Sequence, residues 1–162
     1  MDIPTKIKDA FNAQINMELS SGYIYLSMAA FFETQGLKGF SHWMQKQADE
    51  ERAHAMRFFK HINERNGAVT LQAIPVPKLT WKSPAEAFTD ALAHEKKVSA
   101  SIYSLVEAAS KERDFAAVNF LQWFLNEQIE EEANANEWLQ KLKAAGTGAG
   151  LLFLDSEAGK RS

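Results

Sequence analysis

The sequence predicts an all-α protein: an antiparallel four-helix bundle of two helical hairpins with one long crossover, plus a short C-terminal helix. Three observations predict this fold. Four long segments repeat apolar residues at alternating steps of three and four, the spacing of a buried helix face. Few residues separate the members of each pair of segments, and a longer stretch that contains prolines joins the two pairs.

The first hairpin consists of helices expected over about 5–34 and 37–65. The first helix ends at Gln35-Gly36, and the second ends at Asn66-Gly67. Asn and Gly tolerate the left-handed backbone with which many helices end. The crossover is expected over 67–82, where Pro75 and Pro77 exclude a helix. About sixteen extended residues reach about 53 Å. A helix of about 28 residues is about 42 Å long, so the crossover can return along a whole helix.

The second hairpin consists of helices expected over about 83–110 and 114–145. Ser83 suits the cap of its first helix, Pro84 suits the first helical position, and Glu86 can reach back to the cap. Residues 1–145 therefore form the bundle. In residues 146–162 we expect a glycine-rich joint, a short apolar helix over about 151–157 and a disordered tail from Gly159.

Composition restricts the classes of function. The 162 residues carry a formal charge of −3 and include no cysteine. This charge balance gives no reason to expect a nucleic-acid or membrane partner. The lack of cysteine excludes disulfides, thiolate metal sites and thiol nucleophiles. Neither a signal-peptide pattern nor an apolar run long enough to span a bilayer is evident, so we expect a cytoplasmic location.

Polar residues interrupt each apolar helix face near its middle. They are Glu18 on the first helix, Glu51 and His54 on the second, Glu95 on the third, and Gln128 and Glu131 on the fourth. The spacing from Glu18 to Glu51 equals that from Glu95 to Gln128, so the two hairpins bring these residues to matching heights. The four faces contain no Lys or Arg.

Buried carboxylates without basic partners need another source of charge compensation. Protonation of every one at neutral pH would require large upward pKa shifts. Divalent metal ions fit better, because Glu51-x-x-His54 places two ligands on one helix face. Carboxylate and imidazole ligands suit iron or manganese, with zinc as a lesser option.

These residues resemble the ferritin-like di-iron proteins, in which glutamates and Glu-x-x-His motifs on four helices hold two metal ions. On the fourth helix Gln128-x-x-Glu131 replaces a second Glu-x-x-His, which argues against the bacterioferritin and rubrerythrin patterns. Arg52 stands where bacterioferritins have a haem-ligating Met, so haem is not expected. The chain is most similar to non-haem prokaryotic ferritins, in the phrases around residues 14–18, 49–54 and 123–128.

The resemblance implies roles for individual residues. One iron would be held by Glu18, Glu51 and His54, and the second by bridging Glu51 with Glu95, with Gln128 nearby. A third, outer iron site would use acidic residues that, judged alone, are equally typical of a solvated helix face; they are Glu50, Glu127, Glu130 and Glu131. Tyr25 would lie next to the metal ligands and would form a hydrogen bond there or donate an electron. Trp123 would lie close by and could also be oxidised, although packing alone would equally explain both residues. The resemblance implies no role for His42, His61 or His94, and we expect these histidines to lie at the surface or to line the shell.

The resemblance also implies a function. The protein would oxidise Fe²⁺ with O2 or H2O2 and store Fe³⁺ as mineral inside a shell of 24 identical subunits, with the short helix at 151–157 gathered about a fourfold axis. Two alternatives stay open. A di-iron oxidase or peroxidase of the same fold would stop at about two irons per chain, and a helical interaction module would need no metal.

Overall fold

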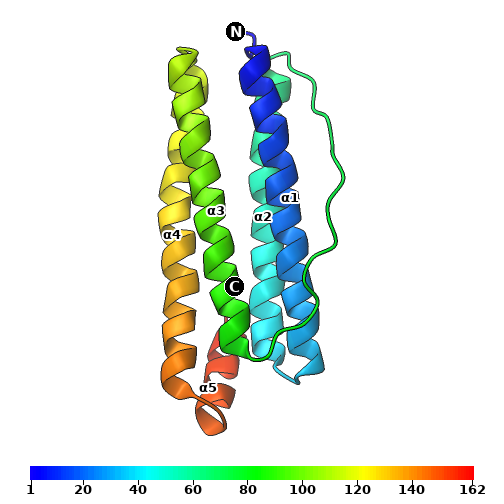
Figure 1. Ribbon diagram of the computed structural model, residues 1–162, viewed down its shortest axis with the longest axis vertical. Coiled ribbons are helices and arrows are strands. Elements are labelled where there is room, and N and C mark those ends of the chain that lie inside the picture. The colour runs from blue at the N-terminus through cyan, green and yellow to red at the C-terminus, as the bar shows by residue number, and fades with distance from the viewer.

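The computed structural model describes residues 1–162 and contains five α-helices and no strands (Figure 1). The observed helix limits lie within two residues of the expected ones. They are α1 at Thr5–Thr34, α2 at Lys38–Glu64, α3 at Pro84–Lys111, α4 at Phe115–Ala145 and α5 at Ala149–Ala158. Helices α1 and α2 form one antiparallel hairpin, α3 and α4 the other, and the two hairpins pack side by side. The expected all-α bundle with a short fifth helix is therefore confirmed.

The helix ends follow from local chemistry. Asn66 ends the first hairpin with a φ of +57°, and Gly36 in the α1–α2 turn has a φ of +73°. Ser83 caps α3 by accepting a hydrogen bond from the Glu86 N–H, while the Glu86 carboxylate accepts from the Lys82 N–H rather than from that of Ser83. Asp114 caps α4 and also pairs with the buried Arg65 at 2.8 Å, which ties the end of one hairpin to the other.

The crossover over 67–82 runs along the outside of α1 for nearly the length of the bundle (Figure 1). Side chains on α1 satisfy its backbone in place of secondary structure. Asn12 donates to the Ala68 carbonyl and accepts from the Thr70 N–H, and Asn16 donates to the Ala73 carbonyl. These bonds explain how an extended segment keeps one fixed path over the surface.

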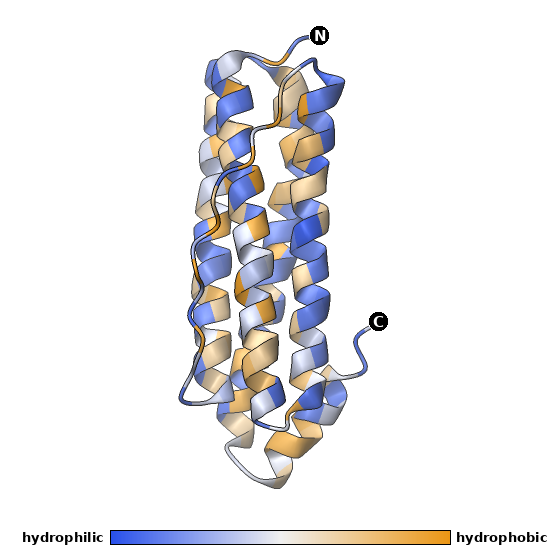
Figure 2. Ribbon diagram, turned by 90° about the vertical axis from the view of Figure 1, so that its right-hand side faces the viewer, coloured by the Kyte–Doolittle hydropathy of each residue, from blue (hydrophilic) through white to orange (hydrophobic).

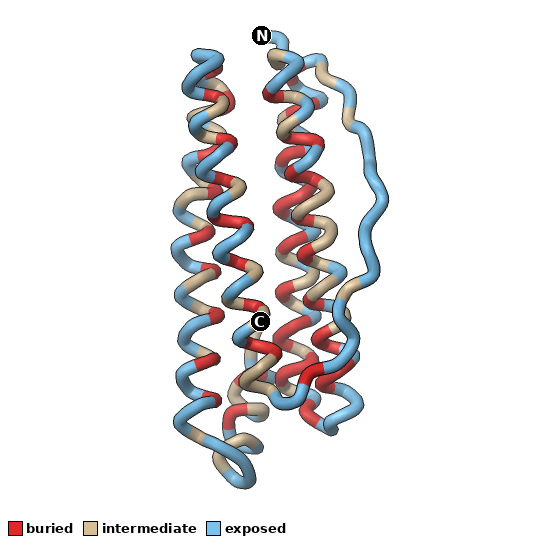
Figure 3. The backbone as a smooth tube through the Cα atoms, in the orientation of Figure 1, coloured by how far each residue is buried: buried red, intermediate tan, exposed pale blue.

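The core consists of two apolar clusters stacked along the bundle axis. One surrounds Phe32, Phe40 and Phe88 near α5, and the other surrounds Phe11 and Phe58 near the opposite end. Buried residues recur on the helix sides that face one another (Figure 3), and every long helix carries both hydrophobic and hydrophilic residues (Figure 2). The layer between the two clusters contains the polar residues described below. None of the helices is apolar over enough residues to cross a bilayer.

Helix α5 packs one face on the start of α2 and leaves the other exposed. Gly39 allows this close approach, because a Cβ there would lie 1.7 Å from the Asp155 carbonyl oxygen. The Phe40 N–H donates to the Asp155 carboxylate at 2.8 Å. Leu154 is buried against the bundle, whereas Leu152 and Phe153 are exposed.

The sequence led us to expect a disordered tail after α5. The structure shows instead that this tail is held against the bundle. The side chain of Arg161 contacts three residues of α2 and is only 19% exposed. The prediction failed because a short polar tail has no apolar pattern, while its order depends on polar partners that only the folded bundle presents.

Candidate metal centre

The polar layer lies between the two apolar clusters, and all four long helices contribute to it. Along α1, for example, Ile15 belongs to one cluster, Tyr25 belongs to the other, and Glu18 lies between them. The side chains of the layer are at most 5% exposed; they are Glu18, Glu51, His54, Glu95, Gln128 and Glu131. The structure therefore brings together the residues that interrupt the four apolar faces in the sequence.

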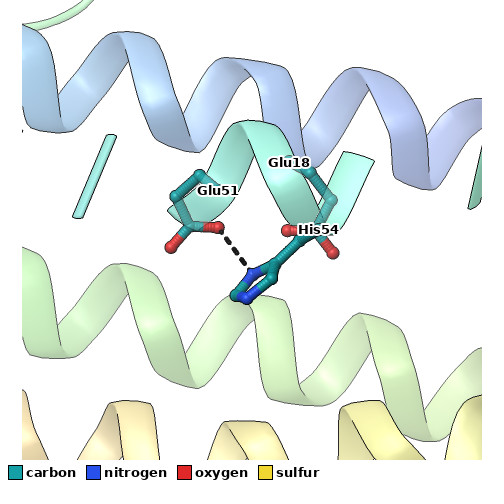
Figure 4. Close-up of side chains that lie close together, drawn as sticks. All are labelled: Glu18, Glu51 and His54. Atoms are coloured by element: carbon teal, nitrogen blue, oxygen red, sulfur yellow. Dashed lines mark ion pairs between the residues drawn. The ribbon is translucent and has the colours of Figure 1, made fainter. Parts of the chain in front are cut away.

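Glu18, Glu51 and His54 form the first group (Figure 4). One ligand atom from each lies within 4.8 Å of the others, a spacing at which a single metal ion could contact all three. The Glu51 carboxylate lies 3.4 Å from Nδ1 of His54, one helical turn further along α2. Three buried donors of the oxygen and nitrogen type suit a transition-metal ion.

Two glutamines hold these carboxylates in place. Gln14 donates from Nε2 to Oε1 of Glu18 at 2.9 Å, and Gln47 donates from Nε2 to Oε1 of Glu51 at 3.3 Å. The other carboxylate oxygen of Glu18, Oε2, is buried and has no hydrogen-bond partner. A buried acceptor without a donor is costly, so this oxygen is free to contact a cation, and the donor set fits a metal ion.

Glu95 forms the opposite side of the layer together with Tyr25 and Gln128. The Tyr25 hydroxyl donates to Oε1 of Glu95, and Gln128 donates from Nε2 to Oε2 at 3.2 Å. Gln128 thus points its amide nitrogen at Glu95 and leaves its carbonyl oxygen available. Tyr25 is fully buried, and its aromatic ring lies edge-on to His94.

A second group of possible ligands combines His54 with two glutamates of α4, one of which is partly exposed. Ligand atoms of His54, Glu127 and Glu131 lie within 4.8 Å of one another. Glu50 does not belong to this group, because its carboxylate is paired with Arg161. Glu130 is exposed and belongs to neither group. The structure therefore brings together two of the four acidic residues expected for an outer site.

Burial and mutual repulsion make the carboxylates of the layer hard to ionise. Burial raises the pKa of Glu18 and Glu51 well above the ordinary value, and neighbouring carboxylates raise it further. Burial also raises the pKa of Glu95, although the Tyr25 hydroxyl opposes this effect. The pKa of Glu131 is raised to about 8 by burial and by Glu95. No Lys or Arg pairs with any of these four carboxylates, so metal ions or protons must compensate their charge.

The unassigned histidines and Trp123 have identifiable partners. His94 is not simply a surface residue, because its Nε2 contacts the Ser21 hydroxyl at 2.7 Å. Burial lowers the pKa of His94 to about 4. His61 stacks on Phe120. Trp123 lies between the His54 ring and the Arg57 guanidinium, which is 3.7 Å from its ring centre.

The sequence did not reveal the roles of Gln47, which supports the layer, and of Arg161, which borders it. Gln47 lies on the apolar face of α2, so its burial could have been predicted from the sequence. The amide side chain does not indicate that Gln47 contacts both Glu51 and Glu131. Arg161 carries no signal at all, because it lies 111 residues from Glu50, with which it pairs.

Known proteins match this chain over nearly its whole length. A model of the ferritin-like domain matches residues 8–145. A bacterial non-heme ferritin of Bacteroides fragilis is 42% identical over 159 residues, which cover 98% of this chain and 99% of that protein. A bacterial non-heme ferritin of Staphylococcus saprophyticus is 37% identical, with 97% and 95% covered. The structure of an open pore ferritin from the archaeon Archaeoglobus fulgidus matches with a TM-score of 0.98 and 47% sequence identity. The match covers 100% of this chain and 100% of that one.

Proposed function

The chain belongs to the ferritin family, and on that premise we propose that it stores iron, oxidising Fe²⁺ at a two-iron site within each subunit. The Fe³⁺ is then deposited as mineral inside a shell of 24 subunits. Iron is the substrate and cargo of this reaction, and dioxygen or hydrogen peroxide is the oxidant. The cytoplasmic location expected from the sequence stays a prediction.

One observation carries the proposal: four glutamates and a histidine are buried together without a Lys or Arg partner. Uncompensated buried charges cost several kcal/mol each, so a fold keeps such a layer only if something offsets the cost. The unpartnered Oε2 of Glu18 and the ligand spacing of Glu18, Glu51 and His54 support a metal ion as the compensating charge.

The residues fit the two iron positions unequally. Glu18, Glu51 and His54 offer three ligands to the first iron, with Glu51 shared. The second iron would have Glu51, Glu95 and the neutral carbonyl oxygen of Gln128. An amide carbonyl oxygen is a weaker donor to iron than the imidazole nitrogen of the first site, and it compensates less cationic charge than a carboxylate at the same position would, so the second iron should bind more weakly and leave more readily.

The carboxylates also favour the oxidised ion. Two Fe²⁺ together give two electrons to the oxidant, and negative ligands stabilise Fe³⁺ more than Fe²⁺. Because burial raises the pKa of these carboxyl groups, iron binding must displace protons from them. Tyr25 holds Glu95 by its hydroxyl and is placed to donate an electron. Burial and the nearby carboxylates raise the pKa of Tyr25 well above its ordinary value, so the hydroxyl keeps its proton at rest.

Iron would leave the layer through the group formed by His54, Glu127 and Glu131, since Glu127 is the least buried of these ligands. Glu50 and Glu130 would take part only if their side chains moved from the observed positions. The exposed Leu152 and Phe153 on α5 support assembly, because apolar side chains at a surface favour contact with another copy.

Static light scattering together with an iron-loading titration tests the proposal. We expect a particle of 24 subunits that takes up many Fe²⁺ per chain while oxygen is consumed. A particle that saturates at about two irons per chain would instead favour the non-storing oxidase. A chain whose melting temperature and absorption spectrum do not respond to Fe²⁺ would refute both.

A further inference from the structure

Arg161 attaches the tail after α5 to the α2 face that borders the polar layer. Its guanidinium lies over the Trp43 ring at 4.4 Å and donates to the Trp43 carbonyl at 3.3 Å. It also donates to Oε1 of Gln47 at 2.9 Å and pairs with the Glu50 carboxylate. His42 contacts the Arg161 carbonyl at 2.8 Å, so both the backbone and the side chain of Arg161 are held.

Gln47 connects this attachment to the buried carboxylates. Its Oε1 faces Arg161, and its Nε2 donates to Oε2 of Glu131 at 2.7 Å and to Oε1 of Glu51 at 3.3 Å. Gln47 is completely buried and therefore has little freedom to turn. Its carbonyl oxygen consequently fixes the guanidinium in the position that reaches Glu50.

We propose that Arg161 is an internal counter-cation for Glu50. Iron must displace the Arg161 guanidinium before Glu50 can join the outer group of Glu127 and Glu131. The inference rests on the proposed function and concerns its regulation: the tail limits how tightly the outer group holds metal ions. Arg161 is thus a positioning residue and contacts no expected metal ligand of the buried layer.

The charges around Glu50 favour this role. The Glu50 carboxylate is close enough for its charge to be among those that act on Glu131. An arginine does not lose its proton, so a metal ion must compete with the guanidinium for the Glu50 carboxylate. Since the Glu50 side chain is 45% exposed, solvent weakens the pair, and its removal should tighten outer-site binding by only about fivefold.

Zn²⁺ titration calorimetry on the assembled, metal-free full-length protein tests the proposal without any oxidation step. The variant is Arg161→Gln, which removes the cation and keeps hydrogen-bonding capacity. Lys160→Gln is the matched control, because Lys160 carries the same charge one residue earlier but pairs with Glu157 at the end of α5. Glu50→Gln, alone and combined with Arg161→Gln, completes a double-mutant cycle.

We expect Arg161→Gln to tighten the weaker class of Zn²⁺ sites about fivefold and to leave the tighter class unchanged. Lys160→Gln should change neither class, and Arg161→Gln should have no effect when Glu50 is already Gln. Equal tightening by Lys160→Gln, or an undiminished effect in the Glu50→Gln background, would overturn the proposal. If Arg161→Gln does not assemble, Arg161→Met also removes the charge and keeps a long unbranched side chain, and unaltered Zn²⁺ affinity of the weaker class in that variant would also overturn the proposal.

The test separates this inference from the proposed function. If the wild-type protein binds no Zn²⁺ in either class, the metal centre itself is wrong. If it binds Zn²⁺ normally and Arg161→Gln matches it, only the role of Arg161 is wrong.

Discussion

Glu131→Gln should make the stability of the metal-free protein less dependent on pH. Glu131 is 5% exposed, and burial and Glu95 raise its pKa to about 8 from an ordinary value of 4.5. Between these two values the folded protein holds a proton on Glu131 that the unfolded chain has released. The contribution of protonated Glu131 to the free energy of unfolding is therefore complete below about pH 4.5, and it is lost as the pH rises through the folded-state pKa of about 8.

The size of the effect follows from the same two values. At about 1.4 kcal/mol per pH unit, the interval sets a ceiling near 5 kcal/mol for the stability lost between the two ends of the window. Gln47 donates to Glu131 at 2.7 Å, and a Gln side chain can still accept that bond through its amide oxygen. Removal of the charge should therefore stabilise the metal-free protein at about pH 8 by roughly 2–5 kcal/mol.

Thermal melting of the metal-free protein, followed by circular dichroism from about pH 5 to about pH 9, checks this expectation over the window set by the linkage relation. Glu130→Gln is the matched control, because it removes an exposed charge next to Glu131 in the sequence. The wild type and Glu130→Gln should lose stability in parallel as the pH rises, and Glu131→Gln should lose less. Parallel losses in all three proteins would refute the reasoning that Glu131 is protonated when the site is empty of metal.

Three other substitutions test separate parts of the structure. Glu51→Gln should slow Fe²⁺ oxidation in a stopped-flow assay at least about tenfold, because it removes the shared ligand; wild-type kinetics would exclude a bridging role. Tyr25→Phe should lower the free energy of unfolding by about 1–3 kcal/mol, since a buried carboxylate loses its donor, while Tyr23→Phe at an exposed position should have little effect. Gly39→Ala should displace α5, because the new Cβ would collide with the Asp155 carbonyl; we expect faster proteolysis at α5, and unchanged digestion would argue against close packing there.

The sequence was sufficient for the helices because their signals are local. Apolar spacing, the Ser83 cap and the left-handed residue Asn66 each act within one or two helical turns, so the helix limits could be predicted within two residues. The polar interruptions could be predicted equally well, since a glutamate on an apolar helix face indicates a buried polar site. Glu18, Glu51 and Glu95 could therefore be named as a buried group before their contacts were known.

Only the tertiary structure decided how that group is supported and bounded. Gln47 contacts Glu131 from another helix, and Arg161 contacts Glu50 across most of the chain. Such pairs depend on which side chains meet after the two hairpins pack, and no periodicity in the sequence encodes them. The residue types and their spacing thus determined that charge is buried at mid-height, whereas the packing decided which carboxylates face the layer and which one the tail neutralises.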